Sequence, residues 1–335
     1  MHTSDPKTLP RVNLRLTALG LGCAQMGGLY RATSAREVED VFGSAWAAGV
    51  RYFDTAPYYG YTRSEHRLGA QLAERPRHEY VVSTKVGRLL RPDAGVAPGD
   101  GGWANPYPFR PVYDYSYSGV MRSFEDSLQR LGLAHIDILY VHDIGRDTHG
   151  DQHAHHWQQL TTGGGFRALD ELRGSGATRA VGLGVNEWRV VMDGMQEFDL
   201  DCTMLAGRYT LLEQDCLTPL LEDCQRRGNA IVVAGPFNSG ILAGNTKFNY
   251  AEAPPAVVAR VKALAQTCQE FNVPLQAAAL QFPLAHPAVV CCVTGTETAA
   301  QLQQNVAWLA QDIPPALWQA LRERGLLNPA APVPA

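Results

Sequence analysis

Four polar residues that can donate or accept protons lie at or near the ends of short apolar runs: Asp54, Tyr59, Lys85 and His142. The run RYF precedes Asp54, YVVST precedes Lys85, and DILYV precedes His142. In a parallel β/α protein, all strands point their carboxyl ends toward one face, so residues far apart in the sequence converge there. We therefore expect these four side chains to form one site.

The four side-chain types match proton transfer coupled to hydride transfer. A tyrosine hydroxyl exchanges protons poorly at neutral pH because its ordinary pKa is about 10. A lysine cation lowers that pKa, and a carboxylate keeps the lysine charged and oriented. Asp54, Lys85 and Tyr59 supply these groups, and His142 can hydrogen-bond the same substrate oxygen. Taken singly, each residue also has an ordinary structural role, as a strand-end cap, a pocket aromatic, a solvated lysine or a core histidine.

The elements that must position these residues follow from the alternation of short apolar runs with longer amphipathic stretches, which is typical of β/α units. The clearest predicted helix begins at Ser34, with Glu37 completing a capping box, and ends at Gly49. Eight strands with crossover helices favour an α/β fold, a (β/α)8 TIM barrel, over an open sheet. The predicted strands lie at residues 17–24, 51–56, 80–85, 137–142, 179–185, 202–207, 230–236 and 289–295.

No flexible linker divides the chain, so we predict a single domain over residues 1–335. The segment 328–335 is rich in Pro and Ala and is expected to be a frayed tail. Two predicted loops exceed the roughly 2–6 residues typical of such folds. Residues 86–117, after strand three, carry many aromatic side chains and are expected to form a substrate-pocket wall. Residues 237–254, after strand seven, could fold over a cofactor, although both loops could instead be solvent-covering insertions.

Composition limits the class of protein. The chain has 335 residues, 45% of them hydrophobic and 19% charged, and a net charge of -4, which is ordinary for a globular enzyme and not for a generic nucleic-acid binder. It has neither a membrane-spanning apolar stretch nor a signal-peptide core, so we expect a cytoplasmic protein, monomeric or a small homo-oligomer. The seven cysteines form no CxxC pair. We expect no metal site and interpret one histidine cluster as an exposed polar loop: His149, His153, His155 and His156.

The segment FDTAPYYGYTRSEHRLGAQL at 53–72 resembles the signature of the aldo-keto reductases, and VVSTK and LYVH are similar to that family's lysine and histidine strands. The resemblance extends from residues 19–28 to 295–309. It implies the (β/α)8 barrel and a nicotinamide dinucleotide bound extended at the barrel mouth, which fits the absence of a Rossmann glycine motif. It also implies a catalytic tetrad in which Tyr59 is the general acid/base: Asp54, Tyr59, Lys85 and His142.

The resemblance is weaker where the family binds its cofactor. Asn186 is kept after strand five, Ala206 stands in place of a usual glutamine, and the tyrosine that commonly stacks on nicotinamide after strand seven is missing. Backbone amides of the strand-seven loop are candidates for binding the pyrophosphate. The positions expected to contact the cofactor are Asn186, Tyr209, Gly235, Pro236, Phe237, Ser239, Gly240, Gly295, Thr296, Glu297, Gln301 and Asn305.

Residues 295–301 bear on the choice of cofactor. Family members that favour the phosphorylated cofactor carry Lys or Arg here, because a 2′-phosphate needs a cation. This chain has Glu297, which would repel a phosphate and could accept a ribose hydroxyl. We therefore expect NAD, with NADP as the alternative.

Three segments, GLGVNEW, MLAGRYTLLEQ and GPFNSGILAG, resemble those of a sugar-dehydrogenase subgroup of the family. They imply oxidation of the anomeric C1 of an aldose, such as L-fucose, D-arabinose or L-galactose, to the lactone. Oxidation of pyridoxal, reduction of aldehydes in general with NADPH, and a non-catalytic nucleotide-sensing role are the alternatives. The expected substrate contacts are Tyr58, Trp103 and Asp143.

Overall fold

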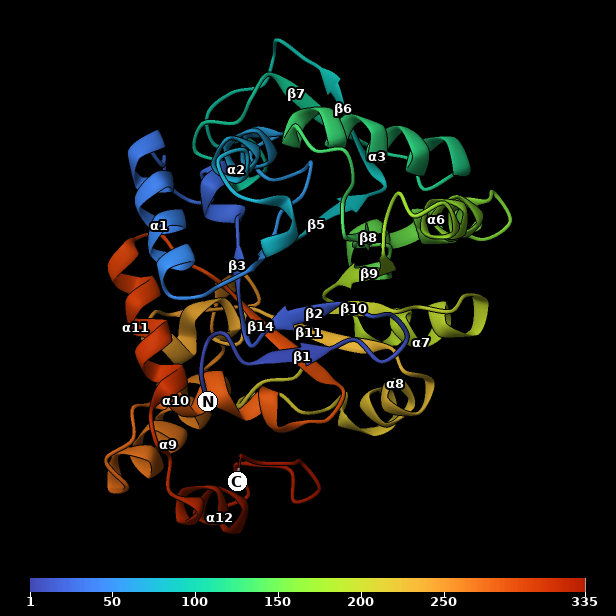
Figure 1. The fold of residues 1–335 in the computed structure, drawn as a ribbon. Helices are drawn as coiled ribbons and strands as arrows, with labels where there is room; N and C mark the ends of the chain where they lie inside the picture. The colour runs from blue at the N-terminus through green and yellow to red at the C-terminus, as the bar shows by residue number, and fades with distance from the viewer. Residues whose placement is uncertain (335) are drawn as a thin grey trace.

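Eight parallel strands form a closed barrel in the computed structural model, which describes residues 1–334 (Figure 1). Each strand pairs with the next along the chain, and the last pairs with the first, so the predicted single-domain (β/α)8 barrel is confirmed. Each of the eight predicted runs coincides with one barrel strand, with ends that differ by at most two residues. In chain order the strands are β3 (Leu19–Gly22), β4 (Tyr52–Asp54), β5 (Val81–Val86), β8 (Ile138–His142), β9 (Ala180–Val185), β10 (Cys202–Ala206), β11 (Ala230–Ala234) and β14 (Val289–Gly295).

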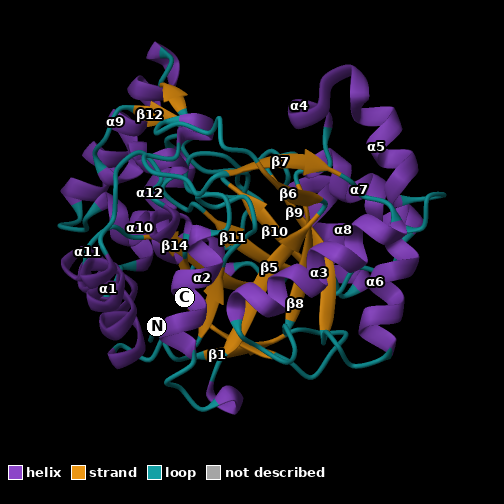
Figure 2. Cartoon of the chain, turned by 90° about the horizontal axis from the view of Figure 1, so that it is seen from above, coloured by secondary structure: helices purple, strands orange, loops and turns teal. Residues whose placement is uncertain are grey.

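Helices surround the barrel and cover its outer surface (Figure 2). The predicted capping box is present at the start of α1, where Ser34 and Glu37 bond each other's backbone N–H. The helices are α1 (Ala35–Ala47), α2 (Arg63–Leu72), α3 (Tyr117–Leu131), α4 (Arg146–His149), α5 (His153–Leu160), α6 (Gly165–Gly174), α7 (Trp188–Glu197), α8 (Glu222–Arg227), α9 (Pro255–Glu270), α10 (Leu275–Gln281), α11 (Ala299–Ala310) and α12 (Pro315–Glu323).

The amino-terminal end of the barrel is closed by the hairpin β1 (Pro6–Thr8) and β2 (Arg15–Thr17). Lys7 Nζ donates to the carbonyl oxygens of Leu284 at 2.7 Å and Val289 at 2.9 Å. These bonds fasten the hairpin beneath β14.

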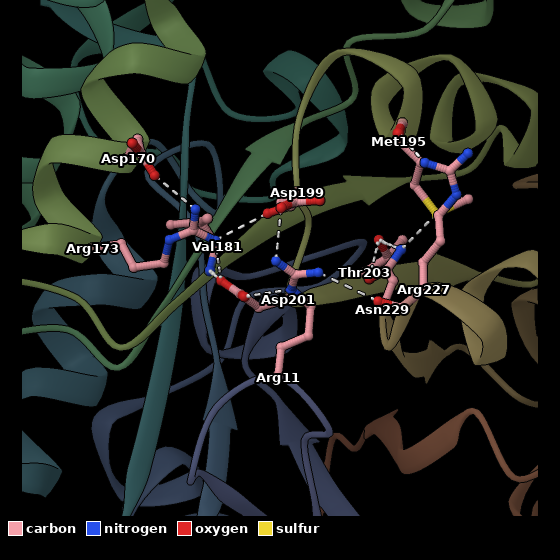
Figure 3. Close-up of polar contacts among 10 residues, drawn as sticks. All are labelled: Arg11, Asp170, Arg173, Val181, Met195, Asp199, Asp201, Thr203, Arg227 and Asn229. Carbon is pink, nitrogen blue, oxygen red and sulfur yellow. Dashed lines mark hydrogen bonds and ion pairs between the residues drawn. The ribbon is translucent and has the colours of Figure 1, made fainter.

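A polar network lies at the same end of the molecule, just before β10 (Figure 3). The Asp201 carboxylate accepts from Arg173 at 2.8 Å and from the backbone N–H of Val181 at 3.1 Å, and Arg11 lies 3.5 Å away. The bond to Val181 joins the residue just before β10 to the start of β9. This network therefore fixes the relative position of neighbouring strands.

Both long loops contain secondary structure. The loop after β5 carries the hairpin β6 (Arg88–Pro92) and β7 (Phe109–Tyr113), and the loop after β11 carries a 3-10 turn and the small hairpin β12 (Lys247–Phe248) and β13 (Ala251–Glu252). Both hairpins follow the carboxyl ends of barrel strands. They therefore build up the walls of the mouth.

The expectation of a frayed tail from residue 328 is wrong for residues 328–334. Ala331 is fully buried, its carbonyl oxygen accepts from Arg322 at 2.6 Å, and Val333 packs on the hydrophobic core. Asn328 N–H donates to Gln214 at 3.1 Å. The small apolar side chains of this segment fit against the barrel, which composition alone could not show; residue 335 lies outside the described residues.

The histidine-rich segment is also not an exposed loop. It forms α4 and α5, and His149 and His153 are buried. His149 Nε2 lies 2.9 Å from the hydroxyl of Tyr115, and burial lowers the pKa of His149 to about 4. Within residues 1–334, no group of three or more His, Cys, Asp or Glu side chains is arranged to hold a metal ion.

The cysteines are buried and unbridged throughout the described part of the chain. Burial raises the pKa of the thiols of Cys202 and Cys292 to about 12, so these thiols behave as small apolar groups. None of the helices described for residues 1–334 is both long and apolar enough to cross a membrane.

Candidate active site

Asp54, Tyr59, Lys85 and His142 lie together at the carboxyl end of the barrel. Lys85 Nζ donates to Asp54 Oδ2 at 2.7 Å, to the carbonyl oxygen of Thr55 at 2.9 Å and to the Tyr59 hydroxyl at 3.1 Å. The Tyr59 and His142 rings lie 6.0 Å apart and nearly perpendicular. The lysine therefore links the carboxylate to the phenol, as the sequence predicted.

Local structure explains how these side chains meet. Asp54 ends β4, and β5 carries Lys85 beside it because Asp54 pairs with Ser83. Tyr59 sits on the turn that follows β4. That turn rests on another glycine-rich turn: Gly60 has φ +62° and lies so close to Gly27 that a Cβ on either would collide with the other's backbone or its neighbour's. Close glycine contact therefore sets the position of the Tyr59 turn.

Burial and charge set the protonation states of the tetrad. Burial raises the pKa of Tyr59 above its ordinary value, although the Lys85 cation opposes this effect. Lys85 lowers the pKa of Tyr59, as expected, but burial raises it by more, because the phenol is enclosed by protein. Burial lowers the pKa of Lys85, yet Asp54 and Tyr59 outweigh it, so the net pKa is raised and the lysine stays charged. At neutral pH the phenol is thus protonated and next to a cation.

His142 ends β8 and is neutral. Burial and the nearby cations Arg88 and Lys85 hold its pKa well below its ordinary value. Its Nε2 lies 3.5 Å from Asp143 Oδ2, and its Nδ1 has no hydrogen-bond partner among the described residues. A neutral imidazole has one N–H donor, so it can hydrogen-bond a substrate oxygen without adding charge.

A chain of buried hydroxyls lies beneath the tetrad, inside the barrel. Ser83 Oγ donates to Asp54 Oδ1 at 2.6 Å and lies 2.9 Å from the Tyr52 hydroxyl. The Tyr52 hydroxyl lies 3.1 Å from that of Tyr140. Asp54 is therefore held on one oxygen by Lys85 and on the other by Ser83, which orients the carboxylate toward the lysine.

A cavity of about 580 Å³ opens above the tetrad, within the range of about 300–1,000 Å³ typical of small-molecule sites. Its lining includes all four tetrad residues and the three expected substrate contacts, Tyr58, Trp103 and Asp143. The Trp103 ring packs edge-on against Tyr58 at 5.5 Å. Four of the expected cofactor positions also line it: Asn186, Gly235, Ser239 and Gly295.

The other expected cofactor positions lie outside this cavity. Tyr209 is the clearest correction: it is fully buried and packs against Phe282 at 5.4 Å and His286 at 5.5 Å. The chain turns at Gly207, with φ +66°, and the Tyr209 ring lies in the core, outside the cavity. Phe237 packs edge-on against Trp308. The remaining positions that do not line the cavity are Pro236, Gly240, Thr296, Glu297, Gln301 and Asn305.

Just outside the cavity, after the lining residue Tyr30, lies an arginine that the sequence did not single out. Arg31 donates to Glu297 Oε2 at 3.0 Å and to Glu37 Oε1 at 2.8 Å. The Glu297 N–H donates to Gln301 Oε1 at 2.8 Å, and Asn305 donates to Thr294 at 3.3 Å. The charge of Glu297 is thus balanced by Arg31, and this arginine is already engaged by two carboxylates.

The cavity offers unpaired polar groups to a nicotinamide cofactor. Gln25 Oε1 and Asn238 Oδ1, from two residues that line the cavity, are buried and accept no hydrogen bond from residues 1–334. Gly235 has φ +60°, and a Cβ there would meet open space. Unpaired acceptors and exposed backbone match the amide and hydroxyl donors of such a cofactor.

Several lining residues were missed by the sequence analysis. Arg88, Tyr250 and Asn249 line the cavity, as does Gln25. Arg88 and Tyr250 come from the two long loops, and only their loop membership gave any signal. Their contact with the site depends on how hairpins β6–β7 and β12–β13 fold over the mouth.

Comparison with known proteins agrees with this geometry. The model of the aldo/keto reductase family matches residues 18–324. Pyridoxal 4-dehydrogenase from Microbacterium luteolum is 51% identical, with 98% of this chain and 99% of that protein covered. D-threo-aldose 1-dehydrogenase from a Pseudomonas species is 41% identical, with 98% and 99% covered.

Solved structures show the same fold. An aldo-keto reductase from Bacillus halodurans superimposes with a TM-score of 0.74 at 22% identity, covering 97% of each chain. Glycerol dehydrogenase from Gluconobacter oxydans gives a TM-score of 0.74 at 19% identity, covering 99% of each chain. The chain therefore belongs to the aldo/keto reductase family and is an oxidoreductase that acts on CH–OH donors with a nicotinamide cofactor.

Proposed function

We propose that this enzyme oxidises cyclic hemiacetals, and aldoses in particular, at the anomeric carbon to give lactones. The observation that carries the proposal is one cavity that joins the Asp54–Lys85–Tyr59 array to a wall of both aromatic and hydrogen-bonding side chains. The wall includes Trp103 and Asp143. Aromatic faces suit the apolar face of a sugar ring, and charged and amide groups suit its hydroxyls.

In this proposal the tetrad holds the anomeric oxygen and removes its proton. The Tyr59 hydroxyl and the neutral His142 ring face the same space, so both can hydrogen-bond that oxygen. The O–H bond breaks and its proton passes to the Tyr59 oxygen, which Lys85 stabilises as a phenolate before transfer. The C1–H bond breaks with its electron pair, and the C1=O bond of the lactone forms. The nicotinamide cofactor, when bound, accepts that hydride.

Three groups of residues would hold the cofactor. All of them line the cavity. Asn186 lies beside the tetrad, Asn238 and Ser239 lie after β11, and Gln25 lies next to Gly295 at the end of β14. We propose NAD as the preferred cofactor. Support comes from the pairing of Arg31 with Glu37 and Glu297, which leaves its cation committed to carboxylates rather than available to a 2′-phosphate.

Pyridoxal is the second candidate substrate, because the relative at 51% identity is named for it. Pyridoxal carries an aldehyde and a hydroxymethyl group on adjacent ring carbons and closes to a cyclic hemiacetal. The same proton and hydride transfer would give a lactone. Tyr58 and Trp103 could stack on its aromatic ring.

A screen of substrates with the purified enzyme tests the proposal. L-fucose, D-arabinose, L-galactose and pyridoxal are supplied with NAD or NADP, and the absorbance of the reduced cofactor is followed. We expect oxidation of at least one aldose, faster with NAD. Turnover of pyridoxal alone would favour the second candidate, and turnover of none of the four would refute the proposal.

The role of Tyr59 is tested separately. We expect Tyr59→Phe to lower kcat by about 10²–10⁴-fold, because the acid/base hydroxyl is lost while the ring remains. Tyr80→Phe is the matched control, since Tyr80 is buried behind the barrel and outside the cavity. Unchanged turnover in Tyr59→Phe would contradict the proposed role.

A further inference from the structure

A largely buried ion pair lies beside the tetrad and joins the hairpin β6–β7 to the residue that follows β8. Arg88, the first residue of hairpin strand β6, donates to Asp143 Oδ2 at 2.5 Å. The side chains of Arg88 and Asp143 are 6% and 18% exposed, and both residues line the cavity. The Arg88 guanidinium lies over the ring of Tyr58, 4.5 Å from its centroid. Burying two charges costs several kcal/mol per ion, which their mutual attraction has to offset, so such a pair is weak evidence for a role in stability.

The backbone also favours a special role for Asp143. This residue follows His142 directly and has φ +44°, in the left-handed region that residues other than glycine seldom adopt. Its N–H donates to the carbonyl oxygen of Gly184 at 2.9 Å, which holds the turn. Strained residues of this kind gather at ligand sites, where the surrounding structure enforces them.

The turn places the carboxylate next to one ring nitrogen of His142. Asp143 Oδ2 lies 3.5 Å from His142 Nε2, and Asp143 Oδ1 lies 3.4 Å from Asn186 Nδ2. Two oxygens on adjacent ring carbons lie about one hydrogen-bond length apart. If His142 holds the reacting oxygen, the neighbouring hydroxyl therefore falls within reach of Asp143.

We infer that Asp143, held in place by Arg88, accepts a hydrogen bond from a hydroxyl on the carbon next to the reacting carbon, so that the enzyme selects cyclic hemiacetals hydroxylated at that position. This inference rests on the proposed function, because it concerns the substrate of the same site. It makes Asp143 a specificity-determining residue and Arg88 a positioning residue.

The charge balance supports this role. Burial raises the pKa of Asp143, and the Arg88 and Lys85 cations oppose the rise. An ionised carboxylate is purely an acceptor, whereas a protonated one also donates. The Arg88 cation thus favours the ionised form of Asp143, which accepts a hydrogen bond from a hydroxyl. The planar guanidinium of Arg88 also fixes the direction of the carboxylate.

Two sugars that differ in one hydroxyl test the inference. D-arabinose carries a hydroxyl on C2, and 2-deoxy-D-ribose is the same pentose without it. We expect the wild-type enzyme with NAD to prefer D-arabinose by at least about 10-fold in kcat/KM, because a site built to bond a hydroxyl is left unpaired by the analogue. Asp143→Ala, which removes the acceptor oxygens, and Arg88→Gln should bring this preference close to one.

Matched controls separate specificity from folding. Asp151→Ala and Arg91→Gln alter exposed residues near the same segments and should keep the wild-type preference. Binding of reduced cofactor, followed by protein fluorescence, and thermal melting show whether each variant is folded. Because the readout is a ratio between two substrates, partial loss of active protein does not change it.

The possible outcomes are distinct. A wild-type preference below about 10-fold, or an Asp143→Ala variant that keeps the full preference, overturns the inference while the proposed function stands. Loss of preference in Asp143→Ala but not in Arg88→Gln overturns the positioning role of Arg88. Turnover of pyridoxal but of no aldose overturns the inference and favours the second candidate substrate, and turnover of none of these substrates refutes the proposed function as well.

Discussion

The two ends of the barrel use similar carboxylate–cation pairs in different ways. At the amino-terminal end, Asp137 accepts from Arg77 at 2.7 Å and from Val82 N–H at 2.9 Å. Asp201 repeats this arrangement with Arg173 and the N–H of Val181 (Figure 3). In both cases the carboxylate binds the start of a neighbouring strand, so it acts as a clamp between strands.

At the mouth, Asp54 and Asp143 bind side chains instead. Asp54 accepts from Lys85 and Ser83, and Asp143 accepts from Arg88 and Asn186; neither side chain bonds a backbone N–H among the described residues. These partners line or adjoin a cavity. A clamp on backbone contributes to stability, whereas a pair of side chains at a cavity can bind and orient a ligand. Substitutions at the two ends should therefore affect different properties.

The largest effect is expected for Lys85→Met, which removes the cation at the mouth. We expect kcat to fall by about 10³-fold or more, because Tyr59 loses the charge that stabilises its phenolate. Burial already raises the pKa of Asp54, so the carboxyl can take up a proton when the lysine is gone. The variant should thus lose most of its activity while it stays folded. Initial rates and urea unfolding of the same preparation measure the two properties. A variant that is largely unfolded, but whose folded fraction turns over normally, would show that Lys85 contributes to stability rather than to catalysis.

The next effect is expected at the opposite end, for Asp201→Ala. We expect the free energy of unfolding to fall by about 1–3 kcal/mol, because the N–H of Val181 is left buried and unbonded. The kcat/KM of the folded enzyme should stay unchanged. Asp199→Ala is the control, since Asp199 is 72% exposed and its pair with Arg11 should contribute less than about 1 kcal/mol. A change in substrate preference in Asp201→Ala would contradict a purely structural role.

The pH dependence of the reaction reports the protonation state of Tyr59 at the mouth. Oxidation requires the phenolate of Tyr59, and burial raises the pKa of that residue. Below this pKa, kcat for oxidation should rise by up to about tenfold per pH unit. Reduction of an aldehyde uses the protonated phenol and should not fall as pH decreases through neutrality. Rates in both directions across a pH series check this, and an oxidation rate that falls from neutral to alkaline pH, with the protein still folded, would contradict it.

The smallest effect is expected just outside the cavity, for Glu297→Gln, which removes the carboxylate paired with Arg31. This change frees one side of Arg31, so the preference for NAD over NADP should fall by about 2- to 5-fold in kcat/KM. Glu323→Gln, on the exposed face of α12, is the control. A stronger preference for NAD in Glu297→Gln would show that Arg31 does not reach the 2′-phosphate.

Much of the site was predictable because it depends on strand ends. Asp54, Lys85 and His142 terminate or nearly terminate β4, β5 and β8, and parallel strands bring such residues together in any barrel. The same holds for Asn186, which directly follows β9. Tyr209 was misplaced because it lies three residues beyond the end of β10, where the path of the turn decides its direction.

The barrel and the meeting of Asp54, Lys85 and His142 follow from the sequence alone, because both depend on local periodicity and on the geometry of parallel strands. The pairs Arg88–Asp143 and Arg31–Glu297 join segments 55 and 266 residues apart and could be found only in the folded molecule. A strand constrains its residues through regular hydrogen bonds, whereas a loop residue meets its partner only once the loops have packed. The proton-transfer site is therefore evident from the strands, and the choice of substrate and cofactor depends on the loops.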